Sequence, residues 1–158
     1  MRFGGEYDEN FPGQWQLWEA ALTRSVNGKK GQAALRDLRD ALLSLPEKRL
    51  IDGRLADPSG CVCTVGALAL KRRMDAGQSR SEALSALVEL VPWDEEWGAV
   101  DEWEAQEATM DEGRRVGLSL TMAVELAARN DDFRETPEER YERVLRYVER
   151  LIVPELVT

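Results

Sequence analysis

Apolar residues recur at helical spacing in two segments near the start of the chain. The first segment follows Pro12 and ends at Asn27-Gly28, a common helix stop. The second begins near Gln32 and ends at Pro46. Both patterns predict amphipathic helices, the first over residues 13–26. The apolar positions are Trp15, Trp18, Leu22 and Val26 in the first, and Ala34, Leu35, Leu38, Leu42 and Leu45 in the second.

The middle of the chain changes from a strand-like to a helical pattern. Asp57-Pro58-Ser59-Gly60 is a turn sequence, and short apolar segments at residues 50–51, 54–56 and 61–63 flank it. These segments predict a small β-hairpin. Small apolar residues at helical spacing follow in residues 65–70, and they predict a buried central helix.

Start signals and apolar stripes predict further helices in the second half. Ser79 and Glu82 have the spacing of a capping box, which predicts a short helix after them. An acidic segment, expected to be helical in part, is followed by predicted helices over about residues 116–130 and 137–153. The chain is therefore predicted to be mainly α: a single compact domain, residues 1–158, of about six helices with one small β-hairpin.

The composition excludes several kinds of chemistry. The chain contains no histidine, so it lacks the commonest metal ligand and the usual general base near neutral pH. A Ser-His-Asp or Cys-His arrangement cannot be built from it. Cys61 and Cys63 would share one face of a strand and could ligate a soft metal across a dimer, or Cys63 could be activated by the next helix N-terminus. We expect both thiols to be reduced, buried and inert.

No segment predicts export or membrane insertion. Residues 1–10 contain acids and no apolar run, and the chain has no stretch of about 18 apolar residues, the length that a membrane helix needs. We therefore expect a cytoplasmic protein that makes no membrane contact.

The excess negative charge is confined to one segment. The formal net charge is −9, and residues 94–112 hold nine acids without a lysine or an arginine. The rest of the chain carries 21 acids and 21 bases, so it is neutral as a set. Three of the five tryptophans, Trp93, Trp97 and Trp103, lie in or beside this segment. Because indoles are favoured interface anchors, the segment predicts a negative, aromatic surface for a basic partner.

The predicted partner-binding surface lies between residues 93 and 104. Its residues are Trp93, Asp94, Glu95, Glu96, Trp97, Asp101, Glu102, Trp103 and Glu104. We expect a protein partner and no direct contact with nucleic acid, because an acidic chain repels phosphates, although the surface could mimic nucleic acid. In the alternative interpretation, Trp93 and Trp97 are one helical turn apart and hold a surface helix to the core while the acids face water. A homodimer interface is equally compatible with the surplus tryptophan.

A polar cluster, Asn130-Asp131-Asp132, separates the last two predicted helices. A calcium loop needs regularly spaced oxygen ligands and a closing Glu, and this sequence lacks that pattern. Thr136-Pro137-Glu138-Glu139 has the form of a capping box, and Asn130 suits a left-handed position just past a helix. The cluster is therefore predicted to be a joint between helices and not a cation or catalytic site.

A competing hypothesis is a small-molecule binder, or an enzyme that depends on carboxylates or a metal. Gly28-Lys29-Lys30-Gly31 could hold a phosphate, but it lacks the spacing of a nucleotide loop, and a solvated loop is favoured. Asp52, Asp57, Asp131 and Asp132 could converge for such chemistry, although nothing in their spacing selects them.

Several sequence blocks spread over most of the chain resemble a known group of proteins. The blocks are GQAALR at 31–36, LPEKRLIDGRL at 45–55, CVCTVGALAL at 61–70, and ARND with TPEERYERVLRYV at 136–148. As a set they resemble uncharacterised small proteins of tailed bacteriophages and prophages. The resemblance implies a mainly helical accessory protein with no assigned activity. Together with the acidic segment, it leads us to expect a non-catalytic phage or prophage protein that binds a host or phage macromolecule and needs no cofactor.

Overall fold

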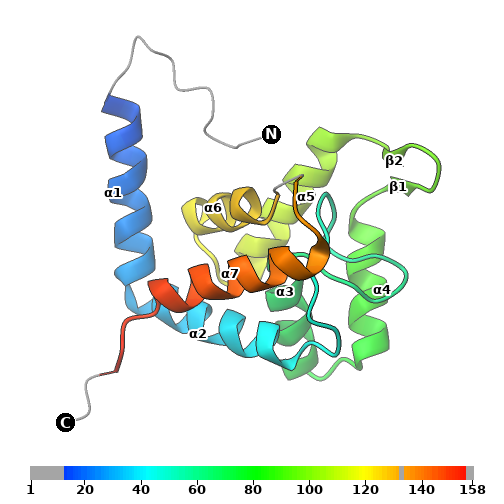
Figure 1. The fold of residues 1–158 in the computed structure, drawn as a ribbon, viewed down its shortest axis with the longest axis horizontal. Coiled ribbons are helices and arrows are strands. Elements are labelled where there is room, and N and C mark those ends of the chain that lie inside the picture. The colour runs from blue at the N-terminus through cyan, green and yellow to red at the C-terminus, as the bar shows by residue number, and fades with distance from the viewer. Residues whose placement is uncertain (1–12, 132–133, 156–158) are drawn as a thin grey trace.

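The computed structural model describes residues 13–131 and 134–155, and over this part of the chain the fold is mainly helical, as predicted (Figure 1). It contains seven helices and one small two-stranded sheet, so the prediction of a mainly α fold is confirmed. The elements are α1 (Gly13–Asn27), α2 (Lys29–Ser44), α3 (Thr64–Asp75), α4 (Arg80–Leu90), β1 (Trp93–Asp94), β2 (Gly98–Ala99), α5 (Glu102–Arg115), α6 (Leu120–Asn130) and α7 (Pro137–Leu151).

Helix α3 is the buried central helix that the small residues predict. All residues from Thr64 to Leu70 are buried, and the helix contacts α2, α4, α5 and α6. A Cβ on Gly66 would lie 2.1 Å from the carbonyl oxygen of Leu55. Only glycine therefore lets α3 approach the preceding loop this closely.

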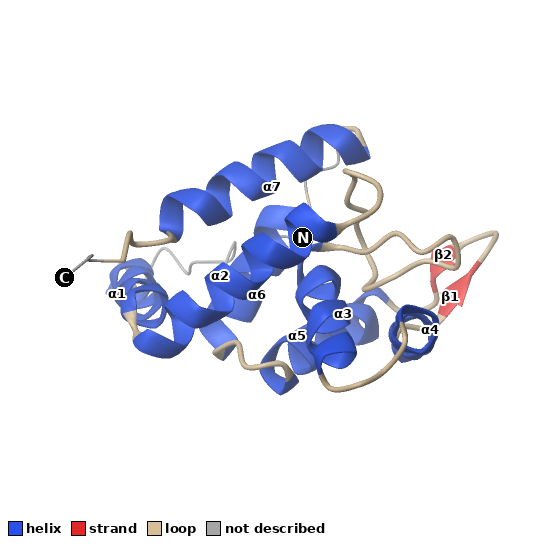
Figure 2. Cartoon of the chain, turned by 90° about the horizontal axis from the view of Figure 1, so that it is seen from below, coloured by secondary structure: helices blue, strands red, loops and turns tan. Residues whose placement is uncertain are grey.

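Helix α7 packs against α2 (Figure 2). Its predicted apolar stripe is turned towards the core. Tyr141, Val144 and Val148 are buried, and the Tyr141 hydroxyl donates a hydrogen bond to the carbonyl oxygen of Leu42 at 3.0 Å. Charged residues of an amphipathic helix ordinarily face water, but Arg140 is only 3% exposed. This arginine is buried because its partners are also inside the fold, as described below.

The predicted hairpin at residues 50–63 is not a hairpin. Its segments form a single antiparallel bridge, between Ala56 and Val62, around the turn at residues 57–60. Leu50, Leu55 and Val62 are almost fully buried, so this segment is a loop packed into the core and not a regular ladder. The small sheet lies instead inside the acidic segment, where Trp93 pairs with Ala99 and Asp94 with Gly98.

The segment Gly28-Lys29-Lys30-Gly31 is a tight corner between α1 and α2 and not the solvated loop that we predicted. Helix α2 already begins at Lys29, with Gly28 as its N-cap. A Cβ on Gly31 would lie 1.8 Å from the carbonyl oxygen of Ser25, so the two helices meet almost in direct backbone contact. The pattern of a phosphate-holding loop is therefore explained by helix packing.

Candidate functional site

The acidic segment folds into two elements, the β1–β2 hairpin and helix α5. Asp94 holds the hairpin turn, since its carboxylate accepts hydrogen bonds from the backbone N–H groups of Glu96 at 2.8 Å and Trp97 at 2.9 Å. Asp101 is the N-cap of α5 and accepts from the N–H groups of Trp103 and Glu104. Two of the predicted partner-binding acids therefore also shape the backbone.

The predicted surface is exposed. Trp97 is 81% exposed and Trp103 63%, whereas Trp93 is 38% exposed because its ring passes close to Gly53 and Gly98. Its six carboxylates (Asp94, Glu95, Glu96, Asp101, Glu102 and Glu104) are exposed as well. Within residues 13–131 and 134–155, no lysine or arginine nitrogen lies within 4.0 Å of any of these six carboxylates.

The alternative in which Trp93 and Trp97 share a face of a surface helix is wrong. Trp93 lies in β1, and Trp97 lies in the turn between the strands. Glu102 and Glu104 occupy the first turn of α5, where the helix dipole favours negative charge. At the other end of the segment, Glu112 is only 3% exposed and is paired with Arg73 at 3.0 Å, so this acid belongs to the interior.

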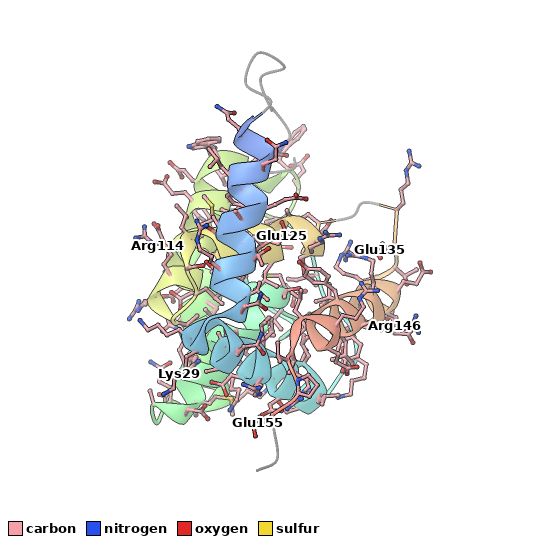
Figure 3. The ribbon with its side chains drawn as sticks, turned by 90° about the vertical axis from the view of Figure 1, so that its left-hand side faces the viewer. Lys29, Arg114, Glu125, Glu135, Arg146 and Glu155 are labelled. Carbon is pink, nitrogen blue, oxygen red and sulfur yellow. The ribbon has the colours of Figure 1, made fainter. Side chains whose placement is uncertain are left out.

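Elsewhere the surface charges are mixed. Figure 3 looks onto the α1 side and shows the basic Lys29, Arg114 and Arg146 among the acidic Glu125 and Glu135. Glu125 and Glu135 are paired with arginines, Arg129 at 2.9 Å and Arg143 at 2.6 Å. The hairpin and the start of α5 thus differ from the α1 side in carrying unpaired charge of one sign.

A pocket with a volume of about 290 Å³ lies beneath this segment. Its wall is built by five parts of the chain: the hairpin, α5, the loop at residues 52–54, Cys63 at the start of α3, and the end of α6. Ala105 of α5 and Ala127 of α6 give it apolar walls, and the Trp93 and Trp97 side chains line it as well. The structure therefore joins the acidic segment to the loop and joint that the competing hypothesis used, whereas residues 28–31 do not line this pocket.

Arg54 is the cation of the pocket. Its side chain is buried, with the residue 6% exposed, and its guanidinium carbon lies 4.6 Å from the centre of the Trp93 ring. No hydrogen bond or ion pair to Arg54 is formed within the described part of the chain, and its Nε is buried without an acceptor. Burial lowers the pKa of Arg54, and the charges of Asp57 and Glu95 act in the opposite direction.

Two uncharged polar side chains of α5 also line the pocket. The Oε1 atom of Gln106 is buried and accepts no hydrogen bond from the residues that the structure describes. The Thr109 hydroxyl donates to the carbonyl oxygen of Ala105 at 2.9 Å, so its proton is already used. Gln106 therefore presents a free acceptor, whereas Thr109 does not present a free donor.

The cysteines agree with the prediction of reduced, unreactive thiols in most respects. Cys63 is buried and caps α3, with its sulfur accepting a hydrogen bond from the Gly66 N–H at 3.3 Å. Burial raises the pKa of the Cys63 thiol to about 12, so the helix N-terminus does not activate it. Cys61 is free and half-buried, and the predicted full burial is wrong for this residue.

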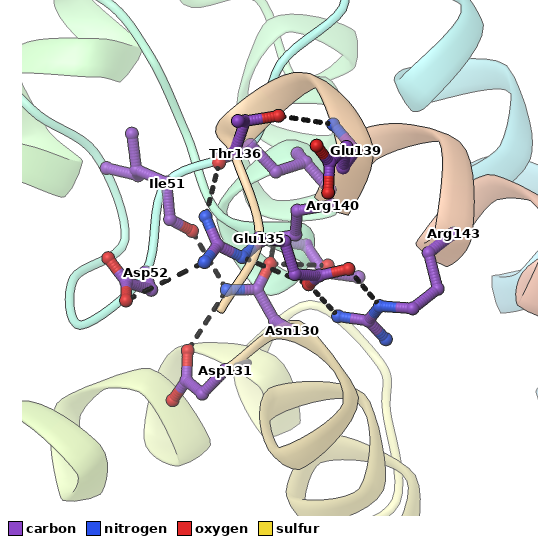
Figure 4. Close-up of polar contacts among 11 residues, drawn as sticks. Ile51, Asp52, Asn130, Asp131, Glu135, Thr136, Glu139, Arg140 and Arg143 are labelled. Atoms are coloured by element: carbon purple, nitrogen blue, oxygen red, sulfur yellow. Dashed lines mark hydrogen bonds and ion pairs between the residues drawn. The ribbon is translucent and has the colours of Figure 1, made fainter. Parts of the chain in front are cut away.

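Asn130 connects three separate parts of the fold (Figure 4). Its side-chain oxygen accepts hydrogen bonds from the Thr64 N–H at 2.9 Å and the Thr64 hydroxyl at 2.7 Å. Its amide donates to the Ile51 carbonyl at 2.8 Å and to the Asp131 carboxylate at 3.1 Å. The predicted left-handed conformation is wrong, because Asn130 is the last residue of α6 and no non-glycine residue of the described chain has a positive φ.

The other groups of the joint have partners within the fold. Arg140 donates to the Leu50 carbonyl at 3.0 Å and lies 3.7 Å from Asp52 and 3.8 Å from Glu135. Thr136 caps α7 by accepting from the Glu139 N–H at 3.1 Å, as predicted. Burial is the main cause that raises the pKa of the half-buried Asp131.

Of the three aspartates of the competing hypothesis that the structure describes, only two come together. Asp52 and Asp131 line the pocket, but the Asp57 carboxylate accepts from the N–H groups of Ser59 and Cys61 in its own turn. Asp132 lies outside the described residues. No group of three or more potential metal-ligating side chains occurs within the ranges that the structure describes.

The fold and the site define a small, mainly helical protein with a pocket under a negatively charged hairpin. Residues 29–112, just over half of the chain, match the family model of DUF6197, a family of unknown function, and the chain belongs to this family. The match runs from the start of α2 into the last part of α5, so it includes Arg54 and the hairpin. No curated protein and no solved structure matches the chain. Among the described helices, none is long and apolar enough to cross a membrane.

Proposed function

We propose that the segment from Trp93 to Glu104 binds a basic protein, and that the protein is a non-catalytic accessory protein. One observation supports this proposal: the segment exposes indoles beside carboxylates that have no cationic partner within the described chain. Unpaired exposed charge steers association with a partner of opposite sign, and exposed indoles can bury a large area once contact is made.

The partner that suits this surface is a protein whose basic groove ordinarily holds nucleic acid. Carboxylates spaced along a hairpin and a helix start present repeated negative charge, as a phosphate backbone does. The resemblance to phage and prophage proteins supports the same proposal, because a phage-encoded protein would meet the nucleic-acid-binding proteins of its host.

A charge-reversal experiment tests the proposed surface. Glu95→Lys combined with Glu96→Lys changes two exposed acids of the hairpin that neither cap a helix nor accept a backbone hydrogen bond from the described residues. The matched control is Glu142→Lys with Glu149→Lys, which makes the same change in charge on the exposed side of α7. Thermal unfolding of all three proteins shows whether the variants remain folded.

The measurement is capture of proteins from a bacterial lysate by the immobilised chain at low and high salt. We expect the parent and the α7 control to retain a set of proteins that high salt and added double-stranded DNA both release. The hairpin variant should lose this set. Equal retention by the hairpin variant would reject the surface, and retention that DNA does not compete would reject the nucleic-acid-binding class of partner.

A further inference from the structure

The pocket beneath the hairpin contains a buried cation that has no ion-pair partner among the described residues. Arg54 is 6% exposed, lines the pocket, and forms no hydrogen bond or ion pair there. Its contact with the Trp93 ring stabilises a guanidinium only partly, since a cation over an aromatic face still has unfilled hydrogen-bond donors. Because buried charges are ordinarily paired, this site is incomplete without an anionic group.

The pocket also presents an unsatisfied acceptor. The buried Oε1 of Gln106 lines the same wall and accepts no hydrogen bond from the described residues. A molecule that fills the pocket therefore needs an N–H or O–H donor in addition to its anionic group. Alanine side chains and the Trp93 ring form the walls between these polar points, and they favour a flat apolar body.

The acidic residues that line the pocket limit how much negative charge a ligand can carry. Asp52, Glu102 and Asp131 also line the pocket, so its surroundings disfavour a dianionic phosphate. A single carboxylate matches the single guanidinium and can accept two parallel hydrogen bonds from it. A volume of about 290 Å³ limits the molecule to one ring or two fused rings.

We propose that this pocket binds a small aromatic carboxylic acid, with its carboxylate on Arg54 and its N–H or O–H donor on Gln106. This binding goes beyond the proposed protein-binding surface and does not depend on it. The two sites share Trp93, Trp97 and Glu102, but the groups that carry this inference are Arg54 and Gln106.

A series of simple probes separates the two recognition elements. Isothermal titration of the full chain with 4-aminobenzoate should show binding in the millimolar range or tighter. Aniline lacks the carboxylate and should bind at least about tenfold more weakly, because it forfeits a charge-assisted pair. Benzoate lacks the donor and should bind about fivefold more weakly. No detectable binding of 4-aminobenzoate, or equal binding of aniline, would overturn the inference.

Variants place the binding in this pocket. Arg54→Met should reduce 4-aminobenzoate affinity by at least about tenfold and remove the preference over aniline. Gln106→Leu should remove the preference for 4-aminobenzoate over benzoate. Ala127→Leu fills the pocket from α6 and serves as a second blocking variant if Arg54→Met unfolds. Unchanged affinity in Ala127→Leu and in a folded Arg54→Met variant would refute the site.

The two proposals fail separately. The Glu95→Lys and Glu96→Lys protein should bind 4-aminobenzoate at least as tightly as the parent, since neither residue lines the pocket and the change at Glu95 removes a negative charge that acts on Arg54. Conversely, Arg54→Met should retain captured proteins, because Arg54 is buried beneath the hairpin. Loss of probe binding in the hairpin variant would contradict the assignment of the carboxylate to Arg54.

Discussion

Two buried arginines in this fold have opposite surroundings. Arg140 is 3% exposed, donates to the Leu50 carbonyl at 3.0 Å, and lies within 4.0 Å of Asp52 and Glu135. Arg54 is 6% exposed and has an aromatic ring as its neighbour but no carboxylate or carbonyl partner within the described chain. The first arginine completes a network inside the protein, whereas the second faces a pocket.

The side-chain amides of Asn130 in the joint and Gln106 in the pocket differ in the same way as the two arginines. Three of the four hydrogen bonds of Asn130 reach elements that are far apart in sequence, namely the loop at Ile51 and the start of α3, and the fourth goes to the neighbouring Asp131. Gln106 has a buried oxygen without a described partner. Polar groups in the joint therefore stabilise the fold, whereas Arg54 Nε and Gln106 Oε1 in the pocket have no partner among the described residues. Substitutions in the two regions should consequently differ in sign as well as in size.

The largest expected effect is at Asn130. Asn130→Ala would leave the Thr64 N–H and hydroxyl and the Ile51 carbonyl without their partners, and we expect the free energy of unfolding to fall by about 4 kcal/mol. The matched change in the pocket, Gln106→Ala, should alter it by less than about 1 kcal/mol. Urea denaturation measures both. Equal losses at the two positions would contradict the division between joint and pocket.

The arginines provide the second comparison. Arg140→Met should lower the free energy of unfolding by about 3 kcal/mol, because it strands the Leu50 carbonyl and leaves Asp52 without its cation. Arg54→Met removes a buried charge that has no ion-pair partner, and it should raise the free energy of unfolding by up to about 1 kcal/mol. Guanidinium would screen these charges, so urea is the better denaturant. A strong loss in Arg54→Met would mean that the fold itself uses this cation.

Local signals in the sequence predict the helices well. Ser79 and Thr136 cap α4 and α7 by accepting from the N–H three residues on, as their spacing predicts. Both signals depend only on neighbours within one turn, so they can be recognised without knowledge of the tertiary contacts. The small residues of α3 likewise predict close packing, which the backbone contact at Gly66 confirms.

Contacts between distant segments explain what the sequence does not reveal. Arg54 follows a turn glycine and looks like an exposed loop residue, and it is buried only because Trp93, 39 residues later, covers it. Asn130 resembles a local helix stop, but its main partner, Thr64, is 66 residues away. The hairpin has a local signal, since Asp94 and Gly98 enclose a short turn between Trp93 and Ala99, but the spacing of Trp93 and Trp97 also fits a surface helix. The pocket forms only where these distant segments meet, so no local signal in the sequence predicts it.

The smallest effect concerns Asp131, which lies where the joint meets the pocket. Burial, aided by the charge of Asp52, raises the pKa of Asp131 in the folded protein above its ordinary value of 3.8. The folded state therefore holds a proton more tightly than the unfolded state does. The resulting contribution to stability is fully present below pH 3.8 and is lost as the pH rises through the folded pKa.

Asp131→Asn removes the loss of stability that deprotonation of Asp131 causes, and it keeps a side-chain oxygen that can accept a hydrogen bond from Asn130. The variant should therefore be more stable than the parent at pH 7, and the gap should narrow as the pH falls towards 3.8. Urea denaturation of both proteins between pH 7 and about pH 3.5 measures the gap, in which the titration of the other carboxylates largely cancels. A gap that stays constant or widens on acidification would show that Asp131 is already satisfied as a charge. Asp131 would then resemble the paired groups around Arg140 and not Arg54, which has no ion-pair partner among the described residues.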